Sequence, residues 1–322
     1  MDKNKIFEIK TSEEFNDIAI DLFEYQYNNN PVYNRYVNLC GFKTNNIQAY
    51  YEIPFLPIEL FRTKKIITGS NPIETVFFSS GTTNKERSKH YIQNLDIYKK
   101  SIARSFQKFV GDPKEYSFLC LIPDFENNPN SSLAFMASEL ISLSQQNHSG
   151  FYLNREKKLI STIKLLEEKN KKFILFGLSF ALLDFAEKYT LNLEKGIVIE
   201  TGGTKKEKKH IVQQELHKKL KLLFNTTKVY SEYGMAELLS QSYHRDNCFE
   251  SPPWKKIIIR DKTNPFKILK DKKRGCINII DLANINSCSF IATNDVGYLN
   301  SSGFNIIGRS QNASERGCNL MI

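Results

Sequence analysis

The stretch VFFSSGTTNKERSKH, residues 76–90, joins a short apolar run to a hydroxyl-rich loop and a basic segment. The apolar run over residues 74–78 predicts a buried strand. Gly81 permits a positive φ, so successive backbone N–H groups of the loop can point into one concavity that suits a polyphosphate. His90 is a candidate contact for a carboxylate or phosphate. Four hydroxyls supply further donors: Ser79, Ser80, Thr82 and Thr83.

An ordinary turn has the same composition as this loop, so the loop alone does not decide its function. It is not the P-loop of nucleotide triphosphatases, because the GxxxxGK[ST] pattern is absent. The segments that follow downstream are needed to choose between the two interpretations.

The composition is that of a globular protein. With 41% hydrophobic and 25% charged residues over 322 positions, the chain can bury a substantial core in one large domain or two. Its net charge of +10 leaves two interpretations open, solvated helix faces or attraction of an acidic ligand. No nucleic-acid-binding motif and no interleaving of basic and aromatic residues accompanies this charge, so we expect no nucleic-acid partner.

Cysteine and histidine spacing predicts no structural zinc. The six cysteines form no CxxC pair, and the five histidines form neither HxxxH nor HExxH. Cys120 lies in an apolar run, where a free buried thiol is typical. No signal-peptide apolar region follows Met1, and no apolar run approaches about 18 residues, which predicts a protein of the reducing cytoplasm without a transmembrane segment.

Apolar periodicity predicts alternating strands and helices. Thr11 and Ser12 can cap a first helix over residues 12–29, and two prolines make residues 51–63 an extended lead-in. The alternation that follows is typical of an α/β fold, a mostly parallel sheet flanked by helices. Strands are predicted over residues 74–79, 116–122, 173–177, 196–200 and 227–230. Helices are predicted over residues 93–109, 131–146, 156–169, 178–189 and 205–222.

After Pro252 and Pro253 the pattern changes to short β-prone runs separated by Asn, Asp, Lys and Gly turns. Residues 256–308 therefore predict a small, mainly antiparallel, β-rich subdomain. We accordingly divide the chain into a helical and extended lead-in (1–70), an α/β core that binds the ligands (71–250) and the β-rich subdomain (251–322).

Two segments that follow predicted strands carry groups suited to a nucleotide. ETGGT, residues 200–204, contains Gly202 and Gly203, which let the backbone approach a flat ligand closely. SEYGMAE, residues 231–237, offers the Tyr233 ring for stacking, Gly234, and the Glu237 carboxylate for Mg²⁺.

A third segment lies in the β-rich region. TNDVG, residues 293–297, contains Asp295, which can accept hydrogen bonds from a ribose diol, and Arg309 further on can neutralise phosphate. In open α/β sheets ligands gather beyond the carboxyl ends of the strands, and these segments together with the loop at residues 79–83 can meet there. Each segment alone is also compatible with a strand end or a turn, and their order along the chain favours a nucleotide site.

The set SSGTT, YGMAE, NDVG and GR resembles the motifs of the adenylate-forming superfamily, which includes acyl-CoA ligases. IPFLPIELFRT (53–63), FFSSGTT, Ser131-Ser132-Leu133, ETGGTK and RGCNL (316–320) are more closely similar to the acyl-protein synthetases of the LuxE type and their phenylacetate–CoA ligase relatives. The resemblance covers residues from about 51 to the last residue. It implies the fold of the N-terminal domain of adenylate-forming enzymes, with the small C-terminal domain of CoA ligases missing.

Carried onto this sequence, the resemblance implies an enzyme that uses ATP and Mg²⁺ to activate a carboxylic acid, a fatty acid in this branch, as its acyl-adenylate. Such a protein acts mostly by positioning and charge neutralisation. Glu237 would bind Mg²⁺, Asp295 the ribose, and Arg309 the ribose or phosphate. The adenine would lie against Gly202, Gly203 and Tyr233, and the ATP phosphates against Ser79, Ser80, Gly81, Thr82 and Thr83.

The resemblance also implies that Cys318 accepts the acyl group as a thioester and passes it to an acyl-CoA-reductase-like partner protein. Gly317 gives this cysteine freedom, and Arg309 and Arg316 favour its thiolate. Two alternatives stay open. The acyl group can pass directly to CoA or another small acceptor with Cys318 a bystander, or the protein is a non-catalytic scaffold that binds acyl or nucleotide ligands.

Four positions and the end of the chain depart from the family pattern. Asn84 replaces the second loop glycine, and Ala236 replaces the Thr or Ser that donates to the α-phosphate, a loss typically worth roughly 10²–10³ in rate. Gln311 and Asn312 stand where many relatives have acidic hinge residues. The chain stops at Ile322, before the region that carries the catalytic lysine of CoA ligases. These departures motivate the scaffold alternative.

Overall fold

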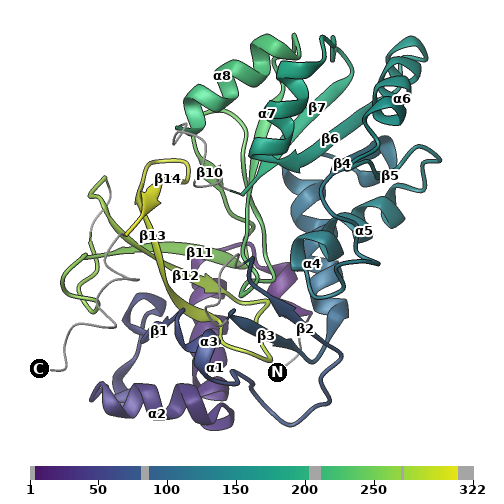
Figure 1. The fold of residues 1–322 in the computed structure, drawn as a ribbon. Helices are drawn as coiled ribbons and strands as arrows, with labels where there is room; N and C mark the ends of the chain where they lie inside the picture. Colours follow the sequence, from purple (N-terminus) through teal and green to yellow (C-terminus); the bar gives the residue numbers. More distant parts are fainter. Residues whose placement is uncertain (1–3, 81–86, 203–211, 270–271, 311–322) are drawn as a thin grey trace, which may run out of the picture. The chain divides into compact units, whose positions relative to one another are not determined.

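The structure is a computed structural model that describes residues 4–80, 87–202, 212–269 and 272–310. The chain forms two compact units (Figure 1). Unit 1 comprises Met1–Tyr98, Ala236–Ser240 and Glu250–Ile322, and unit 2 comprises Lys99–Met235 and Gln241–Phe249. The N-terminal lead-in and the β-rich region, which lie at opposite ends of the sequence, therefore belong to the same unit.

Unit 2 contains a parallel sheet, as the alternating pattern predicts. Its strands are β4 (Ser117–Leu121), β5 (Gly150–Phe151), β6 (Phe173–Leu178), β7 (Gly196–Thr201), β8 (Val229–Tyr233) and β9 (Ser242–His244). Neighbouring strands follow the order β5-β4-β6-β7-β8-β9, with every pair parallel except β8 and β9. Because helices cover both faces of β4, β6 and β7, these strands are apolar almost throughout.

Helices cover the parallel sheet on two sides. They are α4 (Leu95–Phe109), α5 (Ser132–Ser144), α6 (Glu156–Glu168), α7 (Ser179–Lys188) and α8 (Gln213–Leu223). Leu159, Leu182 and Leu216, one from each of α6, α7 and α8, join a buried cluster with strand residues of one face. On the other face the Phe106 ring of α4 lies 5.2 Å from that of Phe118, and Figure 1 shows α4 and the helices α6, α7 and α8 around the strands. No helix of the described residues is long and apolar enough to cross a membrane.

Unit 1 contains an antiparallel sheet, which confirms the β-rich region predicted over residues 256–308. Its strands are β11 (Lys255–Arg260), β12 (Gly275–Asp281), β13 (Phe290–Leu299) and β14 (Phe304–Arg309), paired in sequence order. β1 (Leu56–Pro57) adds a short parallel pairing to β13. The chain passes from unit 2 back to unit 1 in β10 (Phe249–Glu250).

The N-terminal helices pack against the strands of unit 1. They are α1 (Ser12–Asn29), α2 (Pro31–Leu39) and α3 (Leu60–Thr63). Thr11 caps α1 as predicted, since its Oγ1 accepts from the Glu14 N–H at 3.1 Å and the Glu14 carboxylate accepts from the Thr11 N–H. The Phe290 ring of β13 lies 6.4 Å from that of Phe23 in α1, and Gln26 donates to the backbone oxygen of Asn284. The core of unit 1 is thus formed by the N-terminal helices together with strands from the C-terminal part of the chain.

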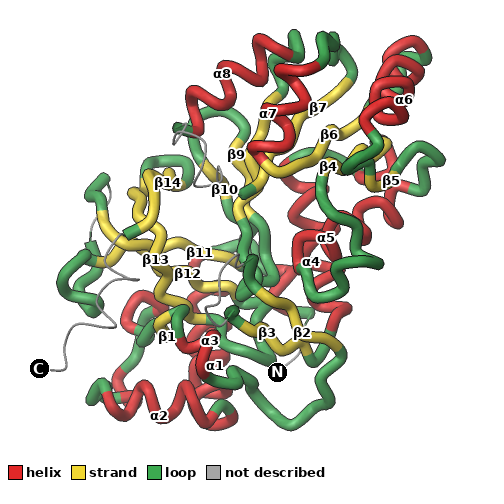
Figure 2. The backbone as a smooth tube through the Cα atoms, in the orientation of Figure 1, coloured by secondary structure: helices red, strands yellow, loops and turns green. Residues whose placement is uncertain are grey.

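The strand predicted over residues 74–79 exists but does not open the parallel sheet. It is β2 (Thr75–Phe78), which pairs antiparallel with β3 (Lys89–Ile92) as a separate hairpin (Figure 2). Our sequence analysis did not predict β3. The ten residues between the two strands are too few for the crossover of about a dozen that a parallel pairing needs, so the chain turns back instead.

Candidate functional site

Gly202 and Tyr233 lie at one edge of the parallel sheet. Their strands β7 and β8 are parallel neighbours in which Thr201 is aligned with Glu232, so the carboxyl ends of both strands meet. Gly202 follows β7 directly and has a φ of +77°, a conformation that favours glycine. Tyr233 is the last residue of β8. These two residues therefore come together as the resemblance implies, whereas Gly203 lies outside the described residues.

A buried polar network ties the same strand ends to two helices. The carboxylate of Glu200 in β7 accepts hydrogen bonds from Ser179 Oγ, at the start of α7, and from Ser231 Oγ in β8. His217 of α8 places its Nε2 2.8 Å from Ser231 Oγ and 3.4 Å from Glu200 Oε1. All four side chains are buried, so the network fixes how β7 and β8 present their ends.

The glycine of the YGMAE segment is required by its neighbours. The Glu232 carboxylate is buried and accepts a hydrogen bond from Thr201 Oγ1. A Cβ added to Gly234 would lie 2.6 Å from Glu232 Oε1, closer than real Cβ contacts. The Tyr233 ring packs at 5.8 Å from the ring of Phe249, which leaves this aromatic pair beside the strand ends.

Glu237 lies in unit 1, on the segment 236–240, which has no helix or strand of its own. Its side chain is nearly inaccessible, since the residue is only 4% exposed. Burial raises the pKa of Glu237, while a hydrogen bond with the Ser88 side chain and the charges of Arg309 and Arg62 act in the opposite direction. The carboxylate therefore has cationic neighbours, but they do not offset the full cost of burying its charge.

His90 of β3 lies beside the same segment. Its Nδ1 is 2.8 Å from the backbone oxygen of Ala236, and because a carbonyl can only accept, Nδ1 carries the proton. Burial lowers the pKa of His90 to about 4, so the ring is neutral at physiological pH. A neutral imidazole offers a ligand hydrogen bonds rather than a positive charge.

Asp295 and Arg309 face each other across β13 and β14. The two residues are aligned in the antiparallel register, and Arg309 Nε donates to Asp295 Oδ1 at 3.0 Å. The Asp295 side chain is 7% exposed and that of Arg309 is 81% exposed. Arg309 can therefore turn toward a ligand, and the pair brings together the two residues predicted to contact ribose and phosphate.

Only the base of the predicted phosphate loop belongs to the described residues. Ser79 Oγ accepts from the Ser88 N–H at 3.0 Å, and the Ser79 N–H donates to the Ser88 backbone oxygen at 3.1 Å. These bonds extend the β2–β3 pairing and close the loop at its base. Ser80 follows as an exposed residue. With Gly203, five predicted site residues lie outside the described residues, the other four being Gly81, Thr82, Thr83 and Cys318.

The surroundings of Glu237 fit a divalent cation. Among the described residues no cluster of three His, Cys, Asp or Glu side chains could hold a metal by itself. Mg²⁺ is usually held by one or two carboxylates together with substrate phosphates and water. The Glu237 carboxylate can supply the one protein ligand of such a site, and a dication there would favour its ionised form.

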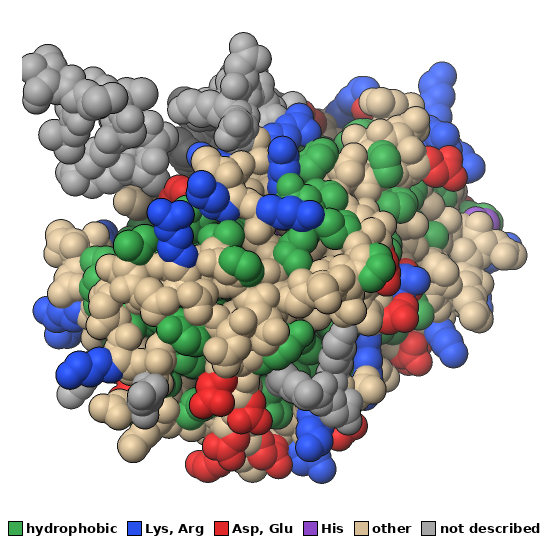
Figure 3. All heavy atoms as spheres, turned by 90° about the horizontal axis from the view of Figure 1, so that it is seen from below, with side chains coloured by type: hydrophobic (Ala, Val, Ile, Leu, Met, Phe, Trp, Pro, Cys, Tyr) green, Lys and Arg blue, Asp and Glu red, His purple; other side chains and the backbone are tan. Residues whose placement is uncertain are grey.

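On the face that Figure 3 shows, the Lys and Arg side chains do not form one continuous stripe. Lys and Arg side chains occur there in several places, and Asp and Glu gather at one edge. Of the two interpretations of the net charge, this face favours solvated basic side chains.

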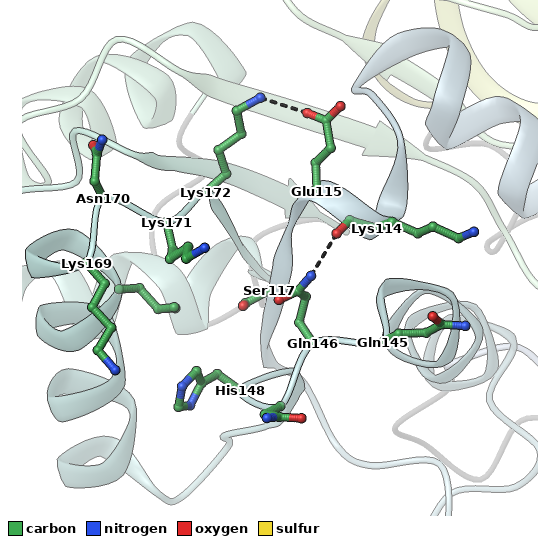
Figure 4. A pocket seen from close by; sticks show the side chains of 12 residues that line it. Lys114, Glu115, Ser117, Gln145, Gln146, His148, Lys169, Asn170, Lys171 and Lys172 are labelled. Carbon is green, nitrogen blue, oxygen red and sulfur yellow. Dashed lines mark hydrogen bonds and ion pairs between the residues drawn. The ribbon is translucent and has the colours of Figure 1, made fainter.

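A basic cavity of about 710 Å³ lies elsewhere in unit 2, and it contains none of the predicted site residues. Ser117 and Lys172 place it at the amino ends of β4 and β6, the opposite sheet edge from Gly202 and Tyr233. Lys172 pairs with Glu115 at 2.7 Å, while the side chains of other lysines extend apart (Figure 4). Such dispersed ammonium groups do not converge on one ligand.

Sequence reasoning did not single out Arg62, Ser88 or His217. Arg62 stands inside IPFLPIELFRT, a segment quoted for the resemblance, but only the fold brings its charge near Glu237. His217 is a buried polar residue on the apolar face of α8, and the amphipathic pattern there is the one available signal. Ser88 carries no sequence signal beyond its position after the loop.

The family is decided by the sequence match. The family described as acyl-protein synthetase, LuxE, matches residues 5–322. The chain belongs to this family. No curated protein matches the sequence.

Solved structures similar to this LuxE-family chain are adenylate-forming ligases. An open conformation of 2-hydroxyisobutyryl-CoA ligase in complex with 2-HIB-AMP and CoA is 13% identical with a TM-score of 0.71, covering 94% of this chain and 70% of that one. ATP-bound MatB from Rhodopseudomonas palustris is 12% identical with a TM-score of 0.57, covering 75% and 49%. At such identities the likeness shows the fold, and the chain spans about half the length of the MatB protein.

Proposed function

We propose that this LuxE-family protein activates a fatty acid with ATP and carries the resulting acyl group on Cys318. One observation in the structure supports the proposal most strongly. This observation is the environment of the buried Glu237 carboxylate in the YGMAE motif. The charges of Arg62 and Arg309 act on it, and it shares a hydrogen bond with Ser88 at the base of the phosphate loop. A carboxylate with two guanidinium groups nearby suits a metal–polyphosphate ligand.

In the first step a carboxylate oxygen of the acid attacks the α-phosphorus of ATP. A P–O bond forms, the bond from the α-phosphorus to the pyrophosphate oxygen breaks, and pyrophosphate leaves with that electron pair. Glu237 would hold Mg²⁺, which neutralises charge on the phosphate oxygens when bound. Arg62 and Arg309 would neutralise further negative charge as it moves toward pyrophosphate. His90, being neutral, would hydrogen-bond a ligand without pairing with its charge.

In the second step the thiolate of Cys318 attacks the acyl carbonyl carbon. A C–S bond forms, the C–O bond to the phosphate of AMP breaks, and AMP leaves, while the thiol proton has gone to solvent. The name of the family, acyl-protein synthetase, and the match of RGCNL to its pattern support this assignment. A partner of the acyl-CoA-reductase kind would then accept the acyl group.

Intact-protein mass spectrometry tests both steps at once. The wild type and Cys318→Ala are incubated with ATP, Mg²⁺ and a mixture of medium- and long-chain fatty acids, and pyrophosphate release is followed in parallel. We expect pyrophosphate release from both proteins and a hydroxylamine-labile acyl adduct on the wild type alone.

Other outcomes would redirect or reject the proposal. An adduct that survives in Cys318→Ala would assign the nucleophile to another residue. Pyrophosphate release without any adduct would support transfer to a small acceptor such as CoA. Bound ATP without pyrophosphate release for any acid would support the scaffold alternative and reject activation.

A further inference from the structure

The segment that carries Glu237 is held by side chains from other parts of unit 1. It has no regular secondary structure, so its backbone groups need partners elsewhere. The backbone oxygen of Ala236 accepts from His90 at 2.8 Å, and that of Glu237 accepts from Asn284 Nδ2 at 2.9 Å. Two carbonyl groups on the N-terminal side of the segment are thereby fixed.

Asp281, the last residue of β12, holds the C-terminal side. Its Oδ2 accepts from the N–H groups of Leu239 and Ser240 at 2.8 and 2.9 Å. Its Oδ1 accepts from Ser240 Oγ at 2.6 Å and from the Ala283 N–H at 3.2 Å. Four donors thus converge on one side chain that is fully buried. Only a group with acceptor sites on both oxygens satisfies all four.

A buried lysine accompanies this carboxylate. Lys255 is aligned with Asp281 in the β11–β12 register and is 2% exposed. Its Nζ donates to the backbone oxygen of Ser240 at 2.9 Å. Burial raises the pKa of Asp281, and the charge of Lys255 and the hydrogen bonds from the Ser240 side chain and the Leu239 and Ala283 backbone act against this effect. The backbone N–H, backbone oxygen and hydroxyl of Ser240 are all engaged by these two residues.

We propose that Asp281, together with Asn284 and Lys255, is a positioning residue for Glu237. This inference rests on the proposed function, in which Glu237 holds the cation of Mg·ATP. These three side chains form a clamp on the backbone from the Glu237 oxygen to Ser240, and His90 fixes the Ala236 oxygen on the other side. The backbone that carries the carboxylate is therefore held in place. Groups that orient a metal-binding side chain typically change metal affinity by about 10–100-fold when they are lost.

Asp281→Asn removes the clamp without changing its shape. In one amide orientation the NH₂ group faces the Leu239 and Ser240 N–H donors, and in the other it faces the Ala283 N–H. At least one backbone N–H therefore loses its acceptor in either orientation. Asn284→Leu is a second isosteric change. It deletes the hydrogen bond to the Glu237 backbone oxygen.

The test measures metal binding directly, because activity alone would not separate positioning from folding. Mn²⁺ binding is titrated by electron paramagnetic resonance in the presence of α,β-methylene ATP, for the wild type, Asp281→Asn, Asn284→Leu and Glu237→Gln. Leu22→Ala is the matched control, because Leu22 is buried in α1 of the same unit and its loss destabilises the protein through a cavity far from the clamp in sequence. All titrations are run well below the lowest melting temperature.

We expect the Mn²⁺ dissociation constant to rise by about tenfold or more in Asp281→Asn, less in Asn284→Leu, and not at all in Leu22→Ala. Wild-type affinity in both clamp variants would overturn the inference, as would an equal loss in Leu22→Ala. Wild-type affinity in Glu237→Gln would also overturn it, since there would be no metal carboxylate to position. Pyrophosphate release by the wild type tests the proposed function separately.

Discussion

At the scale of single residues, Glu237 shows how burial and function conflict. A carboxylate that is 4% exposed is costly to ionise, and its neighbours Arg62 and Arg309 compensate only part of that cost. A residue chosen for stability alone would be neutral here. A bound cation would stabilise the ionised carboxylate. For this reason we propose that Glu237 binds the metal of the proposed reaction.

The first prediction follows from the sign of the pKa shift. The pKa of Glu237 is raised in the folded protein from 4.5, so its contribution to stability is fully present below about pH 4.5 and is lost as the pH rises through the folded value. Glu237→Gln does not suffer this loss. We expect its free energy of unfolding to match that of the wild type near about pH 4 and to exceed it near about pH 8 in urea titrations.

The same variant should lose activity while it gains stability. Metal charge stabilisation contributes several kcal/mol, so kcat/KM for pyrophosphate release should fall by at least about 10²-fold. Ala19→Ser, a change at another buried position of unit 1, is a control that keeps the Glu237 carboxylate and should show no such pH-dependent gain. A Glu237→Gln protein that is active, or less stable than wild type at high pH, would contradict this assignment.

Sequence reasoning could find Tyr233, Glu237 and Asp295 because each stands in a short motif at a strand end. It could not find Asp281 or Asn284, whose importance lies in contacts with residues about 40 positions earlier in the chain. A lone Asp after an apolar strand predicts a turn as readily as a clamp. Partners that only the fold brings together leave no local signal.

At the scale of elements, the β13–β14 hairpin has no room for a side chain at Gly297. Its register shifts between Val296 and Gly297. A Cβ added to Gly297 would lie 2.2 Å from the backbone oxygen of Asn305 and 2.9 Å from Ile277 Cδ1. Backbone cannot give way as a flexible side chain can, so this glycine sets the pairing that aligns Asp295 with Arg309.

We therefore predict that Gly297→Ala destabilises the protein by about 1–3 kcal/mol or more, as overpacking does. Gly150→Ala is the matched control, because the nearest heavy atom to its added Cβ is 4.0 Å away. It should change the free energy of unfolding by at most about 0.5 kcal/mol. Urea denaturation measures both, and equal stability of the two variants would show that the hairpin can relax around the extra methyl group.

In the parallel sheet β4, β6 and β7 were predictable because each contains a continuous apolar run, whereas the short strands β5 and β9 were not predicted. β3 was not predictable, because Lys89, His90 and Tyr91 form no apolar run. Its existence depends on pairing with β2. A hairpin strand defined by its partner is the kind of element that periodicity detects least well.

At the scale of the whole molecule, the cysteines separate by environment. Cys120, Cys248, Cys276 and Cys288 are buried. Burial raises the pKa of Cys120, and it raises that of Cys288 to about 12, so neither thiol forms a thiolate at neutral pH. Thiol chemistry of the native protein is thus left to the remaining cysteines.

We predict that iodoacetamide modifies Cys318 in the native protein and leaves the four buried cysteines unmodified until urea unfolds the chain. Preincubation with ATP, Mg²⁺ and the correct fatty acid should abolish modification of Cys318, because the acyl thioester occupies the sulfur. Peptide mass mapping gives the site of each adduct. Cys40 provides an internal reference, since its labelling should not respond to the substrates.

The division of the chain into units also bears on how the protein is made. Unit 1 draws on both ends of the sequence, and Gln26 of α1 donates to Ser289, 263 residues later. At about 5–20 residues per second of synthesis, α1 waits at least about ten seconds for its strands to leave the ribosome. Unit 2 emerges almost whole during that interval. Translation therefore delivers the parallel sheet first, and the apolar face of α1 has no partner strands until the last part of the chain is made.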